Sequence, residues 1–172
     1  MSEAHFSKFD QVDAAESSIL QELEDSTWGE VFNFQEILVL AKHMAAYRLP
    51  QGATLFKEGD RVPFLCLVYK GQVDVFKEGD DGKEKRLISI RKGRTLGEMS
   101  LVDQEPRSAT CRAAKTTEVL ILDEEGMEKL KESNPLVALA LVTNLAKEIS
   151  RRLRKTTGTL LRADGHSDPV MF

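Results

Sequence analysis

Two stretches near the N-terminus repeat apolar residues at helical spacing. The first, over residues 14–23, places isoleucine and leucine side chains on one face of a helix. The second runs from Phe34 to Met44, and Asn33 stands where a capping side chain is needed at its start. Trp28 lies between the two predicted helices, and we expect it to anchor them to a hydrophobic core.

From Tyr47 onward the pattern changes to short apolar runs separated by turns that carry Gly and Asp. This alternation is typical of an antiparallel all-β unit, and it predicts about eight strands between residues 47 and 122. The clearest runs are Thr54–Phe56, Phe64–Tyr69, Gln72–Phe76, Arg86–Ile90, Ala109–Ala113 and Glu118–Leu122.

Helical spacing returns after the strands. Asp123 is placed to cap a helix that ends near Glu132, before a Ser-Asn-Pro break. The last helix is long, and its apolar stripe alternates three- and four-residue steps, as in a coiled-coil seam. The stripe consists of Leu139, Val142, Ala146, Ile149, Leu153, Thr156 and Leu160.

This stripe either packs against the chain's own strands or meets a second copy. Nothing else in the chain is long enough to cover it, so we expect a homodimer through the helix from Leu139 to Leu160. Thr156 is polar on an otherwise apolar stripe, which suits contact with a polar ligand.

The chain therefore reads as one β unit with helical extensions. The expected units are a flexible N-terminal tail at 1–12, N-terminal helices at 13–46, the β unit at 47–122, C-terminal helices at 123–160 and a flexible tail at 161–172.

Composition and charge narrow the class of protein. The net charge of −4 argues against a chain that mainly coats nucleic acid. No apolar run approaches the ~20 residues of a membrane span, and the N-terminus lacks the layout of a signal peptide, so we expect a cytoplasmic protein without membrane contact. Cys66 and Cys111 sit in apolar runs without metal-ligand spacing, and both are expected to be buried, reduced thiols.

Candidate chemistry concentrates in one turn between two strand-like runs. Glu98 follows Gly97, and Arg107 lies a few residues further on. An Arg fork meets phosphate oxygens with two parallel hydrogen bonds, and a fixed Glu accepts from a sugar hydroxyl. Gly97 lets backbone amides approach an anion closely. The turn therefore suits a sugar-phosphate ligand.

The run from Gly97 to Thr110 resembles the phosphate-binding cassette of cyclic nucleotide-binding domains. Upstream, the Gly59-Asp60 turn and the run from Leu67 to Val75 resemble a turn and hairpin of the same family. The resemblance extends from about Met44 to Leu160. It implies a mainly β fold with flanking helices: an antiparallel, jelly-roll-like β-roll with N-terminal helices and a long C-terminal dimerisation helix.

The resemblance also implies roles for single residues. Glu98 accepts from the ribose 2′-hydroxyl, and Arg107 binds the phosphate; the alternatives are an ordinary solvated Glu and a surface cation. The hydroxyl of Ser108 donates to the phosphate or to the base. Met99 and Ala109, with Leu87 and Leu101, line an apolar wall or simply fill the core. The cassette residues assigned to binding are Gly97, Glu98, Met99, Ser100, Arg107, Ser108 and Ala109.

A shorter resemblance lies in the last helix. The run from Arg151 to Thr157 is similar to the helix that closes over the ligand in the catabolite-activator branch of the family. By this resemblance Thr156 meets the adenine amino group in its own subunit, and Thr157 reaches the ligand of the partner. The alternative is a solvated basic face near a helix end.

The function that follows is a sensor in which a cyclic nucleotide, most simply cyclic AMP, shifts the C-terminal helix and so acts on a protein effector that the sequence does not identify. Cyclic GMP or another cyclic nucleotide remains an alternative, because Ser108 keeps a hydroxyl where the family associates Thr with guanine. A dimeric scaffold that binds no nucleotide is a second alternative.

Two further classes of function are not expected. The chain shows no Ser-His or Cys-His partnership, and its three histidines lie outside the predicted strands, so neither an enzyme nor a metal or cofactor site is expected. After Leu160 only 12 residues remain, whereas a helix-turn-helix module needs several helices, so direct DNA binding is not expected either.

Overall fold

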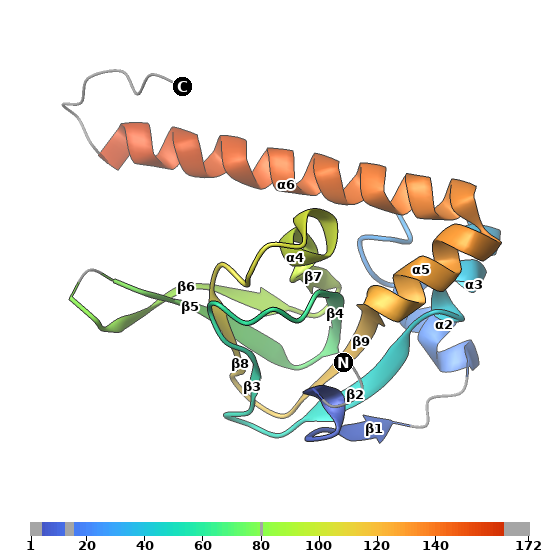
Figure 1. The fold of residues 1–172 in the computed structure, drawn as a ribbon, viewed down its shortest axis with the longest axis horizontal. Helices are drawn as coiled ribbons and strands as arrows, with labels where there is room; N and C mark the ends of the chain where they lie inside the picture. Colours follow the sequence, from blue (N-terminus) through green and yellow to red (C-terminus); the bar gives the residue numbers. More distant parts are fainter. Residues whose placement is uncertain (1–4, 13–15, 80, 164–172) are drawn as a thin grey trace.

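The structure is a computed structural model that describes residues 5–12, 16–79 and 81–163 (Figure 1). Within these residues, two antiparallel sheets form a β-roll, with strand orders β1-β2-β9-β4-β7 and β3-β8-β5-β6. The expected antiparallel β-roll with flanking helices is confirmed. The strands are β1 (Asp10–Val12), β2 (Ala45–Leu49), β3 (Thr54–Phe56), β4 (Phe64–Lys70), β5 (Gln72–Glu78), β6 (Glu84–Arg91), β7 (Arg94–Leu96), β8 (Thr110–Ala113) and β9 (Thr117–Asp123).

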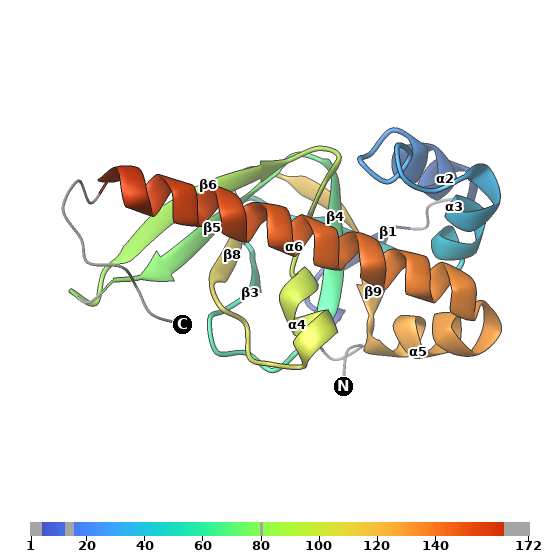
Figure 2. The same cartoon turned by 90° about the horizontal axis from the view of Figure 1, so that it is seen from above.

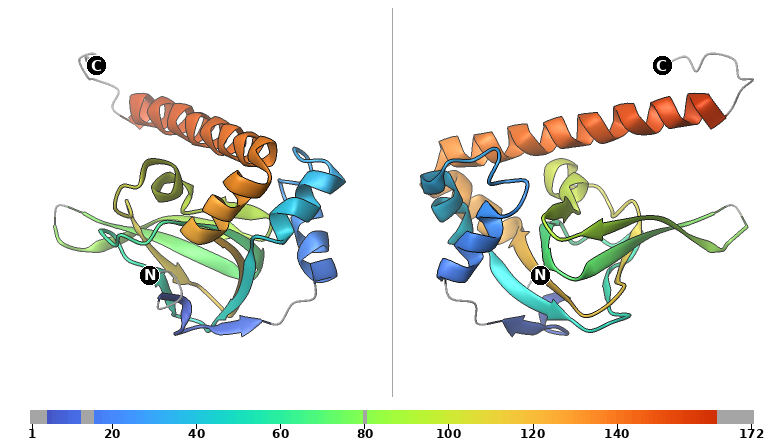
Figure 3. Two further views of the ribbon diagram at one scale, coloured as in Figure 1. Left: turned by 45° about the vertical axis from the view of Figure 1, so that its right-hand side comes forward. Right: turned by 180° about the vertical axis from the view of Figure 1, so that it is seen from behind.

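Five helices in the described ranges flank or interrupt the roll. The helices at Glu16–Glu24, Phe34–Ala41 and Glu124–Ser133 gather at one end of the roll, and the β5–β6 hairpin projects from the other end (Figures 1 and 3). None of the helices in the described ranges is long and apolar enough to cross a membrane. The helices are α2 (Glu16–Glu24), α3 (Phe34–Ala41), α4 (Glu98–Asp103), α5 (Glu124–Ser133) and α6 (Pro135–Ala163).

The N-terminal segment corrects one expectation. Residues 1–12 were expected to form a flexible tail, but Phe6 and Phe9 are buried, and β1 pairs with β2. The Phe6 ring stacks on Tyr47, with ring centroids 4.9 Å apart. The expectation of a flexible tail is therefore wrong for residues 5–12. Two isolated aromatic residues form no periodic pattern, and for this reason the sequence did not predict their packing.

Capping side chains set the helix starts as predicted. The Asn33 side chain accepts from the Glu36 amide at 3.1 Å, and the Glu36 carboxylate accepts from the Asn33 amide at 2.9 Å. Asp123 likewise caps α5 by accepting from the Gly126 amide at 2.9 Å. Helix α3 ends at Ala41, earlier than predicted, since the chain must turn into β2.

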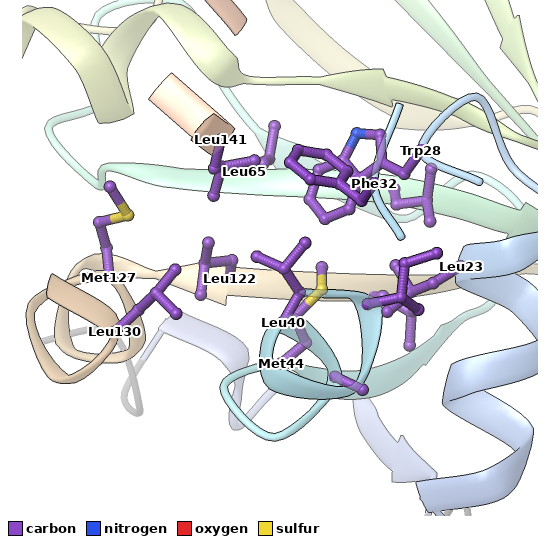
Figure 4. Close-up of a cluster of buried hydrophobic side chains, with 14 of the residues drawn as sticks. Leu23, Trp28, Phe32, Leu40, Met44, Leu65, Leu122, Met127, Leu130 and Leu141 are labelled. Atoms are coloured by element: carbon purple, nitrogen blue, oxygen red, sulfur yellow. The ribbon is translucent and has the colours of Figure 1, made fainter. Parts of the chain in front are cut away.

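Two hydrophobic clusters hold the structure together. One lies inside the roll and includes Cys66 and Cys111, which are buried free thiols as expected. The other joins the outer side of the first sheet to the helices (Figure 4). Trp28 is fully buried there, which confirms its anchoring role. The most deeply buried residues of this second cluster are Leu23, Trp28, Ile37, Leu40, Leu65, Leu67, Leu120, Leu122, Leu130, Leu141 and Leu145.

Helix α6 crosses the molecule above the roll and above α4 (Figures 1 and 2). In its first half, the side chains of Leu141 and Leu145 are fully buried against the rest of the protein. On its outward side, Leu139 and Leu153 are 63% and 66% exposed.

The predicted seam therefore divides into two faces. Val142 and Ile149 are half-buried, whereas Leu139, Ala146 and Leu153 stay exposed on one stripe. The side chain of Leu160 lies outside the described residues. Helix α6 continues to Ala163, into the segment expected to be a flexible tail, and that tail from residue 164 lies outside the described residues.

Candidate functional site

The predicted cassette forms a short helix between two strands. Strand β7 ends at Leu96, and Gly97 then adopts a left-handed conformation with φ 79° at the start of α4. Gln104 ends α4 in the same region of backbone space, with φ 60°. These two reversals bring both ends of the cassette back toward β4 and so place Glu98 and Arg107 at one pocket.

Arg107 is held in one orientation by its surroundings. Its side chain is almost fully buried, and its guanidinium lies 4.0 Å and 4.1 Å from the ring centroids of Phe56 and Phe64. Nη1 donates to the Gly97 carbonyl at 2.7 Å, and Nη2 donates to the Phe64 carbonyl at 3.0 Å. Burial lowers the pKa of Arg107 to about 10, so the group is charged at neutral pH.

Part of the Arg107 fork remains available. The Nε atom is buried and has no hydrogen-bond partner among the residues that the structure describes. A guanidinium carries five N–H donors, and a buried cation with unused donors is strongly favourable for an anion. Arg107 lines the pocket, so its positive charge can attract a phosphate there while the guanidinium keeps its backbone partners.

Glu98 is the matching buried acceptor. The residue is 4% exposed, and burial raises the pKa of its carboxyl group, whereas the nearby Arg152 guanidinium lowers it. Oε1 of Glu98 forms an ion pair with Nη1 of Arg152, which reaches down from α6. Oε2 is buried, and no hydrogen-bond partner for it lies within the described ranges. One carboxylate oxygen is thus free to accept a hydrogen bond from a ligand.

These groups lie on a pocket of about 200 Å³ between the cassette and the second sheet. The charged groups at the pocket are Glu98, Arg107 and Arg152. A slot of this chemistry suits a heterocycle joined to an anionic sugar phosphate. The apolar residues that line the pocket are Phe56, Val75, Ile88, Ile90, Leu96, Met99, Ala109 and Cys111.

A larger hollow of about 500 Å³ lies between the N-terminal segment and α5. Three of its charged side chains already have roles in the fold, because Lys129 pairs with Glu125 and Asp123 caps α5. The pocket at the cassette is therefore the stronger candidate for a ligand site.

Comparison with known proteins agrees with this geometry. Residues 47–134, just over half of the chain, match the family model described as the cyclic nucleotide-binding domain. The chain belongs to this family. The cyclic AMP receptor protein of Thermus thermophilus is 41% identical to this cyclic nucleotide-binding domain over 106 residues, which cover 62% of this chain and 47% of that protein.

Solved structures resemble the domain as well. A cyclic nucleotide-binding domain from Methylobacillus flagellatus superposes with a TM-score of 0.80 over 95% of this chain and 92% of that chain, at 23% identity, a likeness of fold. The catabolite activator protein of Thermus thermophilus superposes with a TM-score of 0.63 over 73% of this chain and 57% of that chain, at 36% identity. The chain spans about half the length of the curated relatives it matches.

The pocket of this cyclic nucleotide-binding domain brings together all the predicted cassette residues. Ser100 is buried, whereas Met99 and Ser108 are exposed at the pocket, where the Ser108 hydroxyl lies 3.9 Å from the Met99 sulfur. Leu101 packs in the core and Leu87 is exposed on β6, so neither lines the pocket. The predicted residues that line it are Gly97, Glu98, Met99, Ser100, Arg107, Ser108 and Ala109.

Thr156 and Thr157 are not among the residues that line the pocket. Both are exposed, and their hydroxyls donate at 3.0 Å to the Arg152 and Leu153 carbonyls of their own helix. Arg152, which reasoning from the sequence did not select, is the residue of α6 that lines the pocket. Its signal was an arginine one helical turn before Thr156, on the same helix face.

Replacement of Gly97 by Ala tests the cassette backbone. A Cβ at this position lies 2.6 Å from Arg107 Nη1 and 2.9 Å from the Phe64 carbonyl oxygen, and the φ of +79° disfavours any side chain. We expect Gly97→Ala to lower the free energy of unfolding by about 2–3 kcal/mol, measured by urea denaturation. The matched control is Gly52→Ala, which has a similar φ of +82° but nothing within 4 Å of the added Cβ. Equal losses in both variants would refute the close-approach explanation.

Proposed function

We propose that this domain is a cyclic nucleotide sensor whose preferred ligand is cyclic AMP. The observation that carries the proposal is the pairing of an unpartnered Glu98 oxygen with an unpartnered Arg107 donor at one pocket. A cyclic nucleotide offers both complements, a ribose hydroxyl and an anionic phosphate. The charge-assisted hydrogen bonds at each end would fix its orientation.

In the proposed complex, Arg107 binds the cyclic phosphate and Glu98 accepts from the ribose 2′-hydroxyl. The apolar residues Val75, Ile88 and Ile90 line the slot that would receive the base. Ser108, exposed beside Met99, is available to a phosphate oxygen or to the base edge. No cofactor or metal ion is needed for binding of this kind.

The signal would leave the pocket through α6. Arg152 of this helix already touches Glu98, so a ligand that engages Glu98 acts on an α6 contact. A ligand shifts α6 only if it favours one helix position over another, and contact of Thr156 or Thr157 with the base in one position would supply that difference. An unidentified protein effector would read the change, and no direct DNA contact by these residues is part of the proposal.

A second copy of the chain is the proposed partner of α6. The exposed stripe of Leu139, Ala146 and Leu153 follows seven-residue spacing, which is the repeat of a two-helix coiled coil. Such an interface would cover apolar side chains that water otherwise surrounds.

Calorimetric titration with cyclic AMP and, separately, cyclic GMP tests the proposal. We expect a dissociation constant on the order of micromolar for cyclic AMP and weaker binding of cyclic GMP. Tighter binding of cyclic GMP would assign the second candidate ligand, which the hydroxyl of Ser108 favours. Absence of binding to either, in folded protein free of copurified nucleotide, would refute the sensor and leave the dimeric scaffold.

A further inference from the structure

A polar cluster fastens α6 to the strand that leads into the cassette. Thr95 lies on β7, two residues before Gly97, and is 1% exposed. Its hydroxyl donates at 3.1 Å to Oε2 of Glu148 on α6. A buried hydroxyl that meets a carboxylate in this way fixes the distance between the strand and the helix.

The same cluster holds Arg152. Its Nη2 donates to the Thr95 carbonyl at 3.1 Å and lies 3.4 Å from Oε2 of Glu148, while Nη1 pairs with Glu98. Glu148 precedes Arg152 by four residues, which is the favourable order for an ion pair along a helix. One guanidinium therefore bridges two carboxylates and a backbone carbonyl.

We propose that Glu148 and Thr95 are positioning residues that hold the Arg152 guanidinium against Glu98. Arg152 is 45% exposed and would otherwise be free to turn toward water, whereas Glu98 is buried and depends on it for charge compensation. Held by Glu148 and Thr95, Arg152 keeps the Glu98 carboxylate ionised and able to accept a hydrogen bond. Its effect on nucleotide affinity rests on the function proposed above.

The charged groups around Glu98 make the proposal testable through the direction in which the pKa of Glu98 changes. Arg152 and Glu148 face Glu98 from α6, and Arg107 faces it from the loop before β8. The Cys66 and Cys111 thiols, on β4 and β8, also interact with Glu98. Burial raises the pKa of Glu98, Arg152 lowers it, and the like charge of Glu148 raises it.

Removal of the Glu148 charge therefore has two opposite effects. Acting only through space, Glu148→Gln lowers the pKa of Glu98, since a like charge is lost. Acting through Arg152, the substitution releases the guanidinium and raises the pKa of Glu98. We expect the second effect to dominate, because the lost partner of Glu98 is in direct contact and Glu148 is not.

The experiment measures the pKa of Glu98 in nucleotide-free protein by carbon-13 NMR of labelled Glu carboxyl groups, with the signal assigned by its loss in Glu98→Gln. We expect the pKa of Glu98 to rise in Glu148→Gln and also in Thr95→Val, which removes the hydroxyl without changing any charge. Thr95→Ser restores the hydroxyl and should keep the wild-type pKa. Glu128→Gln removes the ion pair between Glu128 and Lys131 on α5 and should leave the pKa of Glu98 unchanged. A pKa of Glu98 that stays the same or falls in either Glu148→Gln or Thr95→Val overturns the proposal.

A second titration keeps this inference apart from the sensor function. Calorimetry with cyclic AMP at about pH 7 and at about pH 5 compares the affinity of Glu148→Gln with that of wild type. Because a higher pKa of Glu98 leaves more of its carboxyl group protonated at the lower pH, we expect Glu148→Gln to bind about five- to tenfold more weakly than wild type at about pH 5. If wild-type protein binds no cyclic AMP, the sensor proposal fails, while the NMR result still decides whether Glu148 and Thr95 position Arg152.

Discussion

Replacement of Arg107 by Lys is expected to weaken cyclic AMP binding by a factor on the order of 100 or more, because hydrogen bonds to charged groups contribute roughly 1.5–3 kcal/mol each. A lysine ammonium retains the positive charge, but it cannot present a planar fork to a phosphate. It also cannot lie flat between the Phe56 and Phe64 rings, which contact the guanidinium from 4.0 Å and 4.1 Å. Calorimetric titration at neutral pH measures the loss.

Arg107→Lys should also reduce stability, and this effect must be separated from binding. The native guanidinium satisfies the carbonyls of Gly97 and Phe64, so we expect the free energy of unfolding to fall by about 1–3 kcal/mol. Calorimetric titration at a temperature below the unfolding transition of the variant keeps the variant folded during the binding measurement. Arg107→Leu is less informative, since it removes the charge and leaves both carbonyls without their donor.

Arg112→Lys is the matched control for Arg107→Lys. The Arg112 guanidinium also lies over an aromatic ring, 4.8 Å from the centroid of Phe76, and pairs with Glu84. It does not line the pocket. Nucleotide affinity should therefore remain within about twofold of wild type, as is usual for surface ion pairs. Unchanged affinity in Arg107→Lys would remove the phosphate assignment.

Leu153→Asp is expected to convert the proposed dimer into monomers. Leu153 is 66% exposed on α6, and in a two-helix seam each copy would bury it against the other. Burial of two aspartates without partners raises the dissociation constant on the order of 100-fold or more, since an unpaired buried charge costs several kcal/mol. Sedimentation equilibrium over a range of protein concentrations measures the change.

Leu87→Asp provides the control for Leu153→Asp. Leu87 is 62% exposed, close to the value for Leu153, but it lies on β6 rather than on α6. A dimer that persists in Leu153→Asp and dissociates in Leu87→Asp would move the interface to the β5–β6 hairpin. Loss in both variants would point to unfolding, which circular dichroism detects.

Local chemistry made the cassette predictable. Gly97, Glu98 and Arg107 lie close together in sequence, and the left-handed glycine and the short helix α4 suffice to bring them to one pocket. The alternation of strands and turns likewise predicted an antiparallel all-β unit, which the family resemblance arranges as a β-roll, and side chains close in sequence supplied the caps of α3 and α5. Each of these features depends on residues within a few positions of one another.

Features that depend on distant partners were missed or misplaced. Phe6 packs on Tyr47 and Phe64, so a segment expected to be flexible is part of the core. The guanidinium of Arg152 meets a carboxylate 54 residues away in the sequence. Thr156, expected at the pocket, instead donates to its own helix. The contacts of Phe6 and of Arg152 join residues far apart in the sequence and have no local signature. The Thr156 bond is local, but only the fold shows that its helix turn lies outside the pocket.

The seam of α6 shows the difference between what helical periodicity predicts and what the tertiary structure decides. Periodicity by itself determined that Leu139, Ala146 and Leu153 share a face, because the helical repeat fixes the angle between residues. It did not separate that face from Val142 and Ile149, which the tertiary structure turns toward the protein's own body. Spacing sets which side chains point together, but the burial of a face depends on which surface the fold brings opposite to it. The sequence alone thus determined the pattern of strands and turns and the cassette, and only the tertiary structure decided that α6 reaches the cassette through Arg152.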